Sequence, residues 1–135
     1  MRRGVRHPAF LTSLAVSAGL ALLLASCESP QVVINCTDIE VMGIRATARD
    51  SITGAVIQAD LIRVVAREGS YADSAQATNG SLIKLVGERP GIYEVSVTAT
   101  GYRPWLREGI SVEMQDVCHV RPVSVTALMQ RIPTP

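Results

Sequence analysis

Apolar and polar residues alternate most clearly in the stretch that follows Glu88-Arg89-Pro90-Gly91. From position 93 to position 100 the odd-numbered residues are apolar and the even-numbered residues are polar. This is the two-residue period of a strand that buries one face. Pro90 and Gly91 favour a type II turn in which Gly91 adopts a positive φ. We therefore predict a tight turn at 88–91 and, after it, a strand with Tyr93, Val95, Val97 and Ala99 in a core.

The rest of the chain shows the same alternation in short segments separated by turn residues. Residues 44–50 predict a first strand with Ile44, Ala46 and Ala48 inward, and further strands are predicted at 61–67, 71–77, 81–86 and 106–112. Turns are expected at 51–54, 68–70, 78–80 and 113–116. Asp73 and Ser74 indicate that the 71–77 strand lies at a sheet edge. The last strand, predicted at 117–128, changes face at Pro122, which we interpret as a bulge.

About seven short strands with regular turns, and no helical period after the N-terminal leader, predict an all-β fold of the β-sandwich type, arranged as a Greek key. The domain is expected to cover residues 36–130 and to be followed by a short tail at 131–135. The roughly 109 residues left after removal of the leader are enough for one domain with a modest core.

The first 26 residues have the features of an export signal. A basic flank at 1–8 precedes an apolar run at 9–24, and Leu24-Ala25-Ser26-Cys27 follows it directly. The last four residues resemble the lipobox of bacterial lipoproteins, in which the cysteine thiol receives diacylglycerol and the peptide bond before it is cut. The resemblance implies a cleaved helical signal peptide at 1–26 and lipidated Cys27, followed by a tether at 27–35. The alternatives are an ordinary cleaved secretory signal, or an uncleaved membrane helix that would be rather short for a span.

Lipidation would anchor the protein to a membrane without a spanning segment, since two or three acyl chains hold firmly. In lipoproteins of diderm bacteria an Asp after the lipidated cysteine usually marks inner-membrane retention, whereas here Glu28 follows Cys27. The expected location is therefore the cell envelope, at the outer membrane.

The charge distribution argues against binding to nucleic acid. The leader holds three of the thirteen basic residues, Arg2, Arg3 and Arg6, and none of the twelve acidic ones, so the exported part carries ten basic and twelve acidic residues. No cluster of basic residues is present along the chain, and aromatic residues make up only 4%. Phosphate binding needs a clustered basic surface, and base stacking needs aromatic side chains.

After processing, two cysteines remain besides Cys27. Cys36 and Cys118 stand near opposite ends of a small exported domain, which predicts a disulfide. The alternative is a pair of free or metal-binding thiols. A zinc site would lack ligands, because only His119 lies nearby and no CxxC spacing occurs. We expect no metal and no cofactor.

Three motifs resemble the carboxypeptidase regulatory-like domain, a transthyretin-like β-sandwich. They are Asp50-Ser51-Ile52-Thr53-Gly54-Ala55, Pro90-Gly91-Ile92-Tyr93-Glu94-Val95 and Gly101-Tyr102. The resemblance spans about residues 43–128, and Trp105 with Cys118-His119-Val120 also looks like a group of short bacterial exported proteins. It implies a non-catalytic accessory or binding module whose partner is supplied in trans, on a fold that classification places among carbohydrate-binding-like folds. Such motifs define a fold rather than a function.

No enzymatic constellation is apparent in the sequence. No Gly-x-Ser-x-Gly elbow is present, and His119 is the single histidine after processing, so a surface or supporting role is expected for it. Asp50 and Asp116 could bind calcium, but they lack further oxygen ligands, so we expect them to cap their own turns. The protein is predicted not to be an enzyme.

Two readings remain open for the aromatic residues near position 105. In the first, Tyr102 hydrogen-bonds the backbone at a corner and Trp105 covers an end of the core. In the second, Tyr102, Arg103, Trp105 and Arg107 form an exposed patch for a sugar ring or a protein. The leading functional hypothesis is an envelope module that binds protein by strand addition at the 71–77 edge. The alternative is a carbohydrate or cell-wall binding module that uses the Trp105 region.

Overall fold

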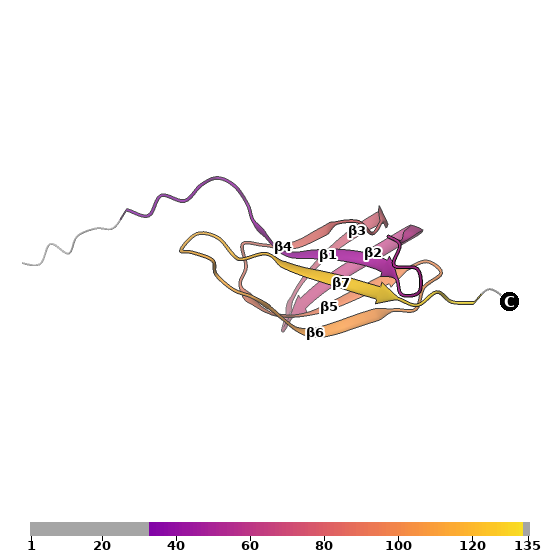
Figure 1. Cartoon of the computed structure of the whole chain (residues 1–135). Helices are drawn as coiled ribbons and strands as arrows, with labels where there is room; N and C mark the ends of the chain where they lie inside the picture. The colour runs from indigo at the N-terminus through magenta and orange to yellow at the C-terminus, as the bar shows by residue number, and fades with distance from the viewer. Residues whose placement is uncertain (1–32, 134–135) are drawn as a thin grey trace, which may run out of the picture. The chain divides into compact units, whose positions relative to one another are not determined.

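The computed structural model describes residues 33–133, which form seven β-strands and no helix (Figure 1). The strands are β1 (Met42–Asp50), β2 (Gln58–Glu68), β3 (Tyr71–Asn79), β4 (Ile83–Gly87), β5 (Gly91–Ala99), β6 (Trp105–Val112) and β7 (Val123–Met129). The predicted signal peptide and Cys27 lie outside the described residues. Within residues 33–133 there is no helix with the length and apolar character needed to cross a membrane.

The strands form two sheets packed against each other, which confirms the predicted all-β sandwich. One sheet has the order β4-β1-β7 and the other the order β3-β2-β5-β6. Figure 1 shows β1 between β4 and β7. All neighbouring pairs are antiparallel except β1 and β7, which run parallel with Ile44 opposite Val123. Strand β3 is terminal in its sheet, as predicted for an edge strand.

The core lies between the inner faces of the two sheets. Ile44, Ala46 and Ala48 of β1 are at most 2% exposed, and the four predicted inward residues of β5 are at most 8% exposed. Both predictions from alternation are therefore confirmed. Burial of these apolar side chains contributes about 25 cal/mol for each Å² removed from water, and it is the main force that holds the two sheets together.

The predicted long last strand is wrong in its first half. Residues 117–122 form a loop in which Val120 makes an isolated bridge to Met114, and the strand begins only at Val123. Val120 is fully buried although it lies in this loop. The change of face at Pro122 therefore marks the junction of a loop and a strand, not a bulge within one strand.

The turn before β5 is also formed differently from the prediction. Gly91 does not adopt a positive φ; Val86 and Glu88 do, with φ of 61° and 45°. Gly91 instead leaves room for the Glu68 carboxylate, which would have to move if position 91 carried a side chain. That carboxylate accepts hydrogen bonds from the Ile92 amide at 2.9 Å and from Arg89 at 2.6 Å. The positive φ of Glu88 belongs to the site described next.

Candidate functional site

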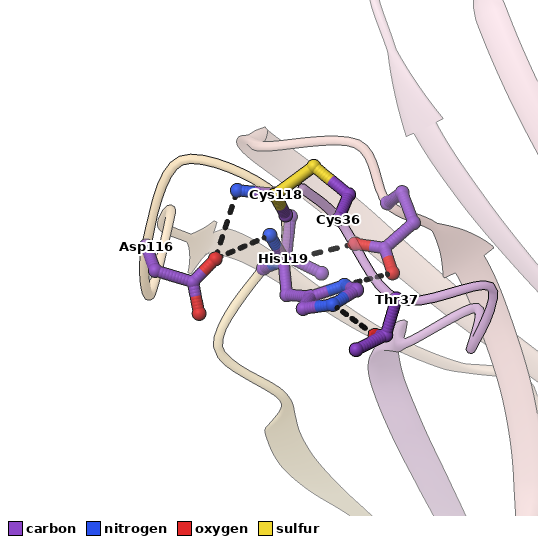
Figure 2. Close-up of a disulfide and its surroundings, with 7 residues drawn as sticks. Cys36, Thr37, Asp116, Cys118 and His119 are labelled. Atoms are coloured by element: carbon purple, nitrogen blue, oxygen red, sulfur yellow. Dashed lines mark hydrogen bonds and ion pairs between the residues drawn. A yellow bond between two sulfur atoms is a disulfide. The ribbon is translucent and has the colours of Figure 1, made fainter. Parts of the chain in front are cut away.

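A disulfide joins the segment before β1 to the loop between β6 and β7 (Figure 2). Cys36 and Cys118 are bonded with a Cα–Cα distance of 5.6 Å, across 82 positions of sequence. This confirms the predicted pairing. The bond brings Thr37 and His119, the residues that follow the two cysteines, to the same end of the sandwich.

Asp116 organises the loop that carries Cys118. Its Oδ1 accepts hydrogen bonds from the amides of Cys118 at 2.8 Å and His119 at 2.9 Å (Figure 2). These two donors, the Cys118 amide first, lower the pKa of Asp116. Asp50 caps the turn after β1 in the same way, with its Oδ1 bound to the amides of Ile52 and Thr53. The predicted capping role of both aspartates is confirmed.

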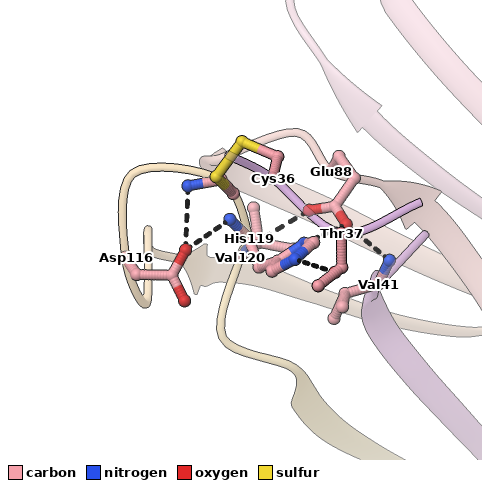
Figure 3. Close-up of polar contacts among 8 residues, drawn as sticks. Cys36, Thr37, Val41, Glu88, Asp116, His119 and Val120 are labelled. Carbon is pink, nitrogen blue, oxygen red and sulfur yellow. Dashed lines mark hydrogen bonds and ion pairs between the residues drawn. A yellow bond between two sulfur atoms is a disulfide. The ribbon is translucent and has the colours of Figure 1, made fainter. Parts of the chain in front are cut away.

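Glu88 is the residue at which three segments of the chain meet (Figure 3). Its Oε1 accepts hydrogen bonds from the Val41 amide at 2.6 Å and from His119 Nδ1 at 2.8 Å. Its Oε2 accepts from the Val120 amide at 3.2 Å. The Val41 amide is the largest cause of a lowered pKa for Glu88, followed by the hydrogen bond to His119. The start of β1, the β4–β5 turn and the β6–β7 loop are thus joined through one carboxylate.

His119 extends this contact to the segment before β1. An ionised carboxylate can only accept, so Nδ1 carries a proton, and in the neutral ring Nε2 is left to accept from the Thr37 hydroxyl at 2.9 Å (Figure 3). His119 and Glu88 line an open hollow of about 250 Å³ with Cys36, Thr37, Asp38, Ile39, Glu40 and Cys118. Sequence reasoning noticed His119 but missed Glu88 and Thr37.

The relay of hydroxyl, imidazole and carboxylate has the order of a nucleophile, a base and an orienting acid. Here the Glu88 carboxylate also binds two backbone amides, and Thr37 lies on an exposed segment. The hollow is open to solvent, whereas acyl transfer requires walls that exclude water. We interpret the relay as a clamp that fixes the segment before β1 to the end of the sandwich.

The four residues of the predicted patch do not form one exposed surface. Tyr102 is only 8% exposed, and its hydroxyl donates to Asp50 Oδ2 at 3.4 Å and accepts from Arg131 at 2.7 Å. Trp105 is half-buried against the core, opposite Val97. Arg103 and Arg107 are exposed. Tyr102 therefore holds a corner through side chains rather than offering a ring to a ligand.

The edge of β3 is held at one point and is otherwise regular. Asp73 Oδ2 accepts a hydrogen bond from the Val86 amide at 2.7 Å, which ties β3 to the strand β4 of the other sheet. On the outer face of β3, the side chains at 72, 74, 76 and 78 are small or polar and exposed, and on the inner face Ala75 and Ala77 are half-buried.

Within residues 33–133, no group of three His, Cys, Asp or Glu side chains could hold a metal ion.

The fold and this site define a small β-sandwich in which residues 36–41, the segment before β1, are closed onto the domain by a disulfide and a carboxylate clamp. Comparison with known proteins adds no narrower class, because no family model and no curated protein matches the sequence. The resemblance to carboxypeptidase regulatory-like domains remains a prediction carried by the motif residues.

Proposed function

We propose that the chain is a non-catalytic, lipid-anchored protein of the cell envelope, located at the outer membrane. Its sandwich belongs among carboxypeptidase regulatory-like domains and acts as an interaction or scaffolding module for another envelope protein. Cys27 carries the lipid in this proposal, and the tether leads to Cys36, where the disulfide begins.

The free edge of β3 is the observation that supports this function best. β3 has nine residues, pairs with β2 on one side only, and contains no proline or lysine. Edge strands are commonly protected by lysine, proline or an inward charge, and β3 has only the last of these, at Asp73. The part beyond Asp73 offers unpaired backbone groups to an extended segment, which is the mode of recognition by strand addition.

Cross-linking in intact envelopes, followed by mass spectrometry on the tagged protein, tests the proposal. A recurrent protein partner is expected, and its cross-links should involve β3. The double variant Ser74→Lys/Gln76→Lys adds two charges to the edge and should abolish those cross-links. In Cys27→Ala the anchor is absent, so the protein should leave the membrane fraction and lose the partner.

A matched control is available on the same outer face. Val65 of β2 has two register partners, Ser74 on β3 and Ser96 on β5. Arg63 of β2 likewise pairs with Gln76 on β3 and Thr98 on β5. Ser96→Lys/Thr98→Lys therefore adds the same charges to the central strand β5, and the partner should be retained. Equal loss in both double variants, or no recurrent protein in any sample, would refute strand addition at β3.

The alternative is a carbohydrate or cell-wall binding module at the Trp105 region. Burial of Tyr102 leaves half-buried Trp105 as the one aromatic ring of the predicted patch, with exposed Arg103 and Arg107 beside it in sequence. Recovery of glycan and no protein in the cross-linking experiment, with loss of that glycan in Trp105→Ala, would favour this alternative.

A further inference from the structure

The outer face of the β4-β1-β7 sheet carries basic and hydroxyl side chains without any acidic residue. We call it the basic face. It consists of seven outward positions on the three strands: Arg45, Thr47, Arg49, Lys84, Ser124, Thr126 and Leu128. All are exposed except Thr47, which is half-buried. The exported part of the chain is slightly acidic as a whole, so this face differs in sign from the rest of the molecule.

Two of its cations lie directly opposite each other. Arg45 of β1 is the register partner of Lys84 on β4 and of Ser124 on β7. Like charges at opposed positions destabilise a sheet. Among the ion pairs of residues 33–133, neither Arg45 nor Lys84 has a carboxylate partner that would offset this repulsion. This arrangement of charges therefore does not stabilise the sandwich itself.

The outer face of the other sheet has the opposite arrangement. There Arg67 of β2 is the register partner of Glu94 on β5, so a basic and an acidic residue face each other. Arg49 on the basic face donates one hydrogen bond to the Gly54 carbonyl at 2.8 Å, which leaves further guanidinium N–H groups unused. Guanidinium, ammonium and hydroxyl groups on one surface match the oxygens of phosphate.

We propose that the basic face docks on the phosphate headgroups of anionic lipids in the membrane that carries the anchor. The inference rests on the lipid anchor of the proposed function. Cys36 lies nine positions after Cys27, and an extended chain of that length reaches about 30 Å. Strand β1 itself is about 30 Å long. A tether of this length, fixed at Cys36 by the disulfide, allows the sheet to lie flat on the bilayer, and exposed Leu128 adds an apolar contact.

Lys84 is the single lysine of the chain and therefore reports on this face. The full lipidated protein is incorporated into vesicles of phosphatidylcholine, with or without phosphatidylglycerol. Acylation of Lys84 by an uncharged amine-reactive ester is then followed by peptide mass spectrometry. Acylation is expected to be about fivefold slower or more on the anionic vesicles. High salt should remove most of this protection, because exposed charges are screened.

Arg63→Lys supplies an internal standard, since position 63 lies on the outer face of the opposite sheet. The lysine introduced there should react at the same rate on both kinds of vesicle. Arg45→Ser should reduce the protection of Lys84, while Arg67→Ser on the opposite sheet should leave it unchanged. Equal protection of both lysines would overturn the proposal, because it would indicate an effect of the vesicle on the reagent. Equal acylation of Lys84 on neutral and anionic vesicles would overturn it as well.

Two further measurements test docking on lipid and the lipid anchor separately. Protection of Lys84 by inorganic phosphate on neutral vesicles would indicate a site for a free anion, and would overturn docking on lipid. Flotation of the protein with neutral vesicles tests the anchor alone. If the protein does not float with neutral vesicles, the anchor is disproved. If that protein still binds anionic vesicles and Arg45→Ser abolishes the binding, the result supports the basic face without the anchor. Failure to bind either vesicle would overturn both.

Discussion

At the scale of single residues, Glu88 joins three segments of the chain through one side chain. Its pKa is held below the ordinary value of 4.5, first by the Val41 amide and next by the hydrogen bond to His119. A carboxyl with a lowered pKa in the folded state stabilises the fold above its ordinary pKa, and this contribution is lost as the pH falls through the lowered value. Glu88→Gln should therefore lower the Tm at neutral pH. The difference from the unmodified protein should shrink as the pH falls below about 4.5.

Thermal unfolding followed by circular dichroism between acidic and neutral pH measures this effect. Glu108→Gln is the control, because it makes the same chemical change at an exposed position of β6. The control should reproduce the pH profile of the unmodified protein. A Glu88→Gln protein with an unchanged neutral Tm would show that the clamp does not stabilise the fold.

Gly80 illustrates a second role for a single residue. Its amide donates to the Ile57 carbonyl, and its carbonyl accepts from the Ala48 amide. A Cβ at position 80 would lie 2.7 Å from the Ala48 carbonyl oxygen and 2.8 Å from the Ala48 Cβ. Because the obstacle is partly backbone, Gly80→Ala should lower the free energy of unfolding by about 1–3 kcal/mol. Chemical denaturation should show no comparable loss for Ser81→Ala, the adjacent exposed position.

The roles of some of these residues could be predicted from the sequence and the roles of others could not, for physical reasons. Asp50 and Asp116 bind amides two and three positions further on, so local sequence was enough to predict their capping roles. Glu88 binds residues 31, 32 and 47 positions away, and such distant partners leave no local pattern. Its positive φ is also unusual for a residue with a side chain. The proline before Gly91 predicts a positive φ there, whereas in the structure Gly91 lacks one and leaves room for the Glu68 carboxylate.

At the scale of elements, the inner face of β1 sets the position of the smaller sheet. Ile44 is fully buried and lies opposite Leu85 on one side and Val123 on the other. Ile44→Ala should lower the free energy of unfolding by about 2–5 kcal/mol, because it removes buried methyl groups and leaves a cavity. Ile52 is 85% exposed in the turn after β1, so Ile52→Ala should change the free energy of unfolding by no more than about 0.5 kcal/mol. Similar losses in the two variants, measured by denaturant titration, would contradict the observed burial.

Alternation predicted which residues of β1 and β5 face the core, since the period of a strand is local. It could not predict that β7 runs parallel to β1, because alternation is the same for either direction of a neighbour. It also extended the last strand to residue 117, since Val117 and Val120 are apolar like strand residues. In the structure Val120 is buried although it lies in a loop, and Val117 in the same loop is 71% exposed. An apolar residue in a loop cannot be distinguished from a strand residue by its type.

At the scale of the whole molecule, the disulfide closes a loop that contains nearly the entire sandwich. It spans 82 positions, and a crosslink of that length removes unfolded-state entropy worth about 4.5 kcal/mol in the chain-entropy model. Cys36→Ala/Cys118→Ala should therefore lower the free energy of unfolding by about 4–5 kcal/mol. Denaturant titration of the oxidised protein, the reduced protein and the double variant measures the loss. The reduced protein and the variant should agree.

The disulfide and the Glu88 clamp hold the same two parts of the chain together, residues 36–41 and residues 118–120. Contacts that share partners are not additive in their effect on stability. Without the crosslink, the segment before β1 must lose more conformational freedom before Thr37 and Val41 can reach His119 and Glu88, so the clamp contributes less to stability. Glu88→Gln should then lower the Tm less in the Cys36→Ala/Cys118→Ala background than in the oxidised protein. Equal effects in the two backgrounds, in a double-mutant cycle, would show that the clamp holds this end of the sandwich independently of the disulfide.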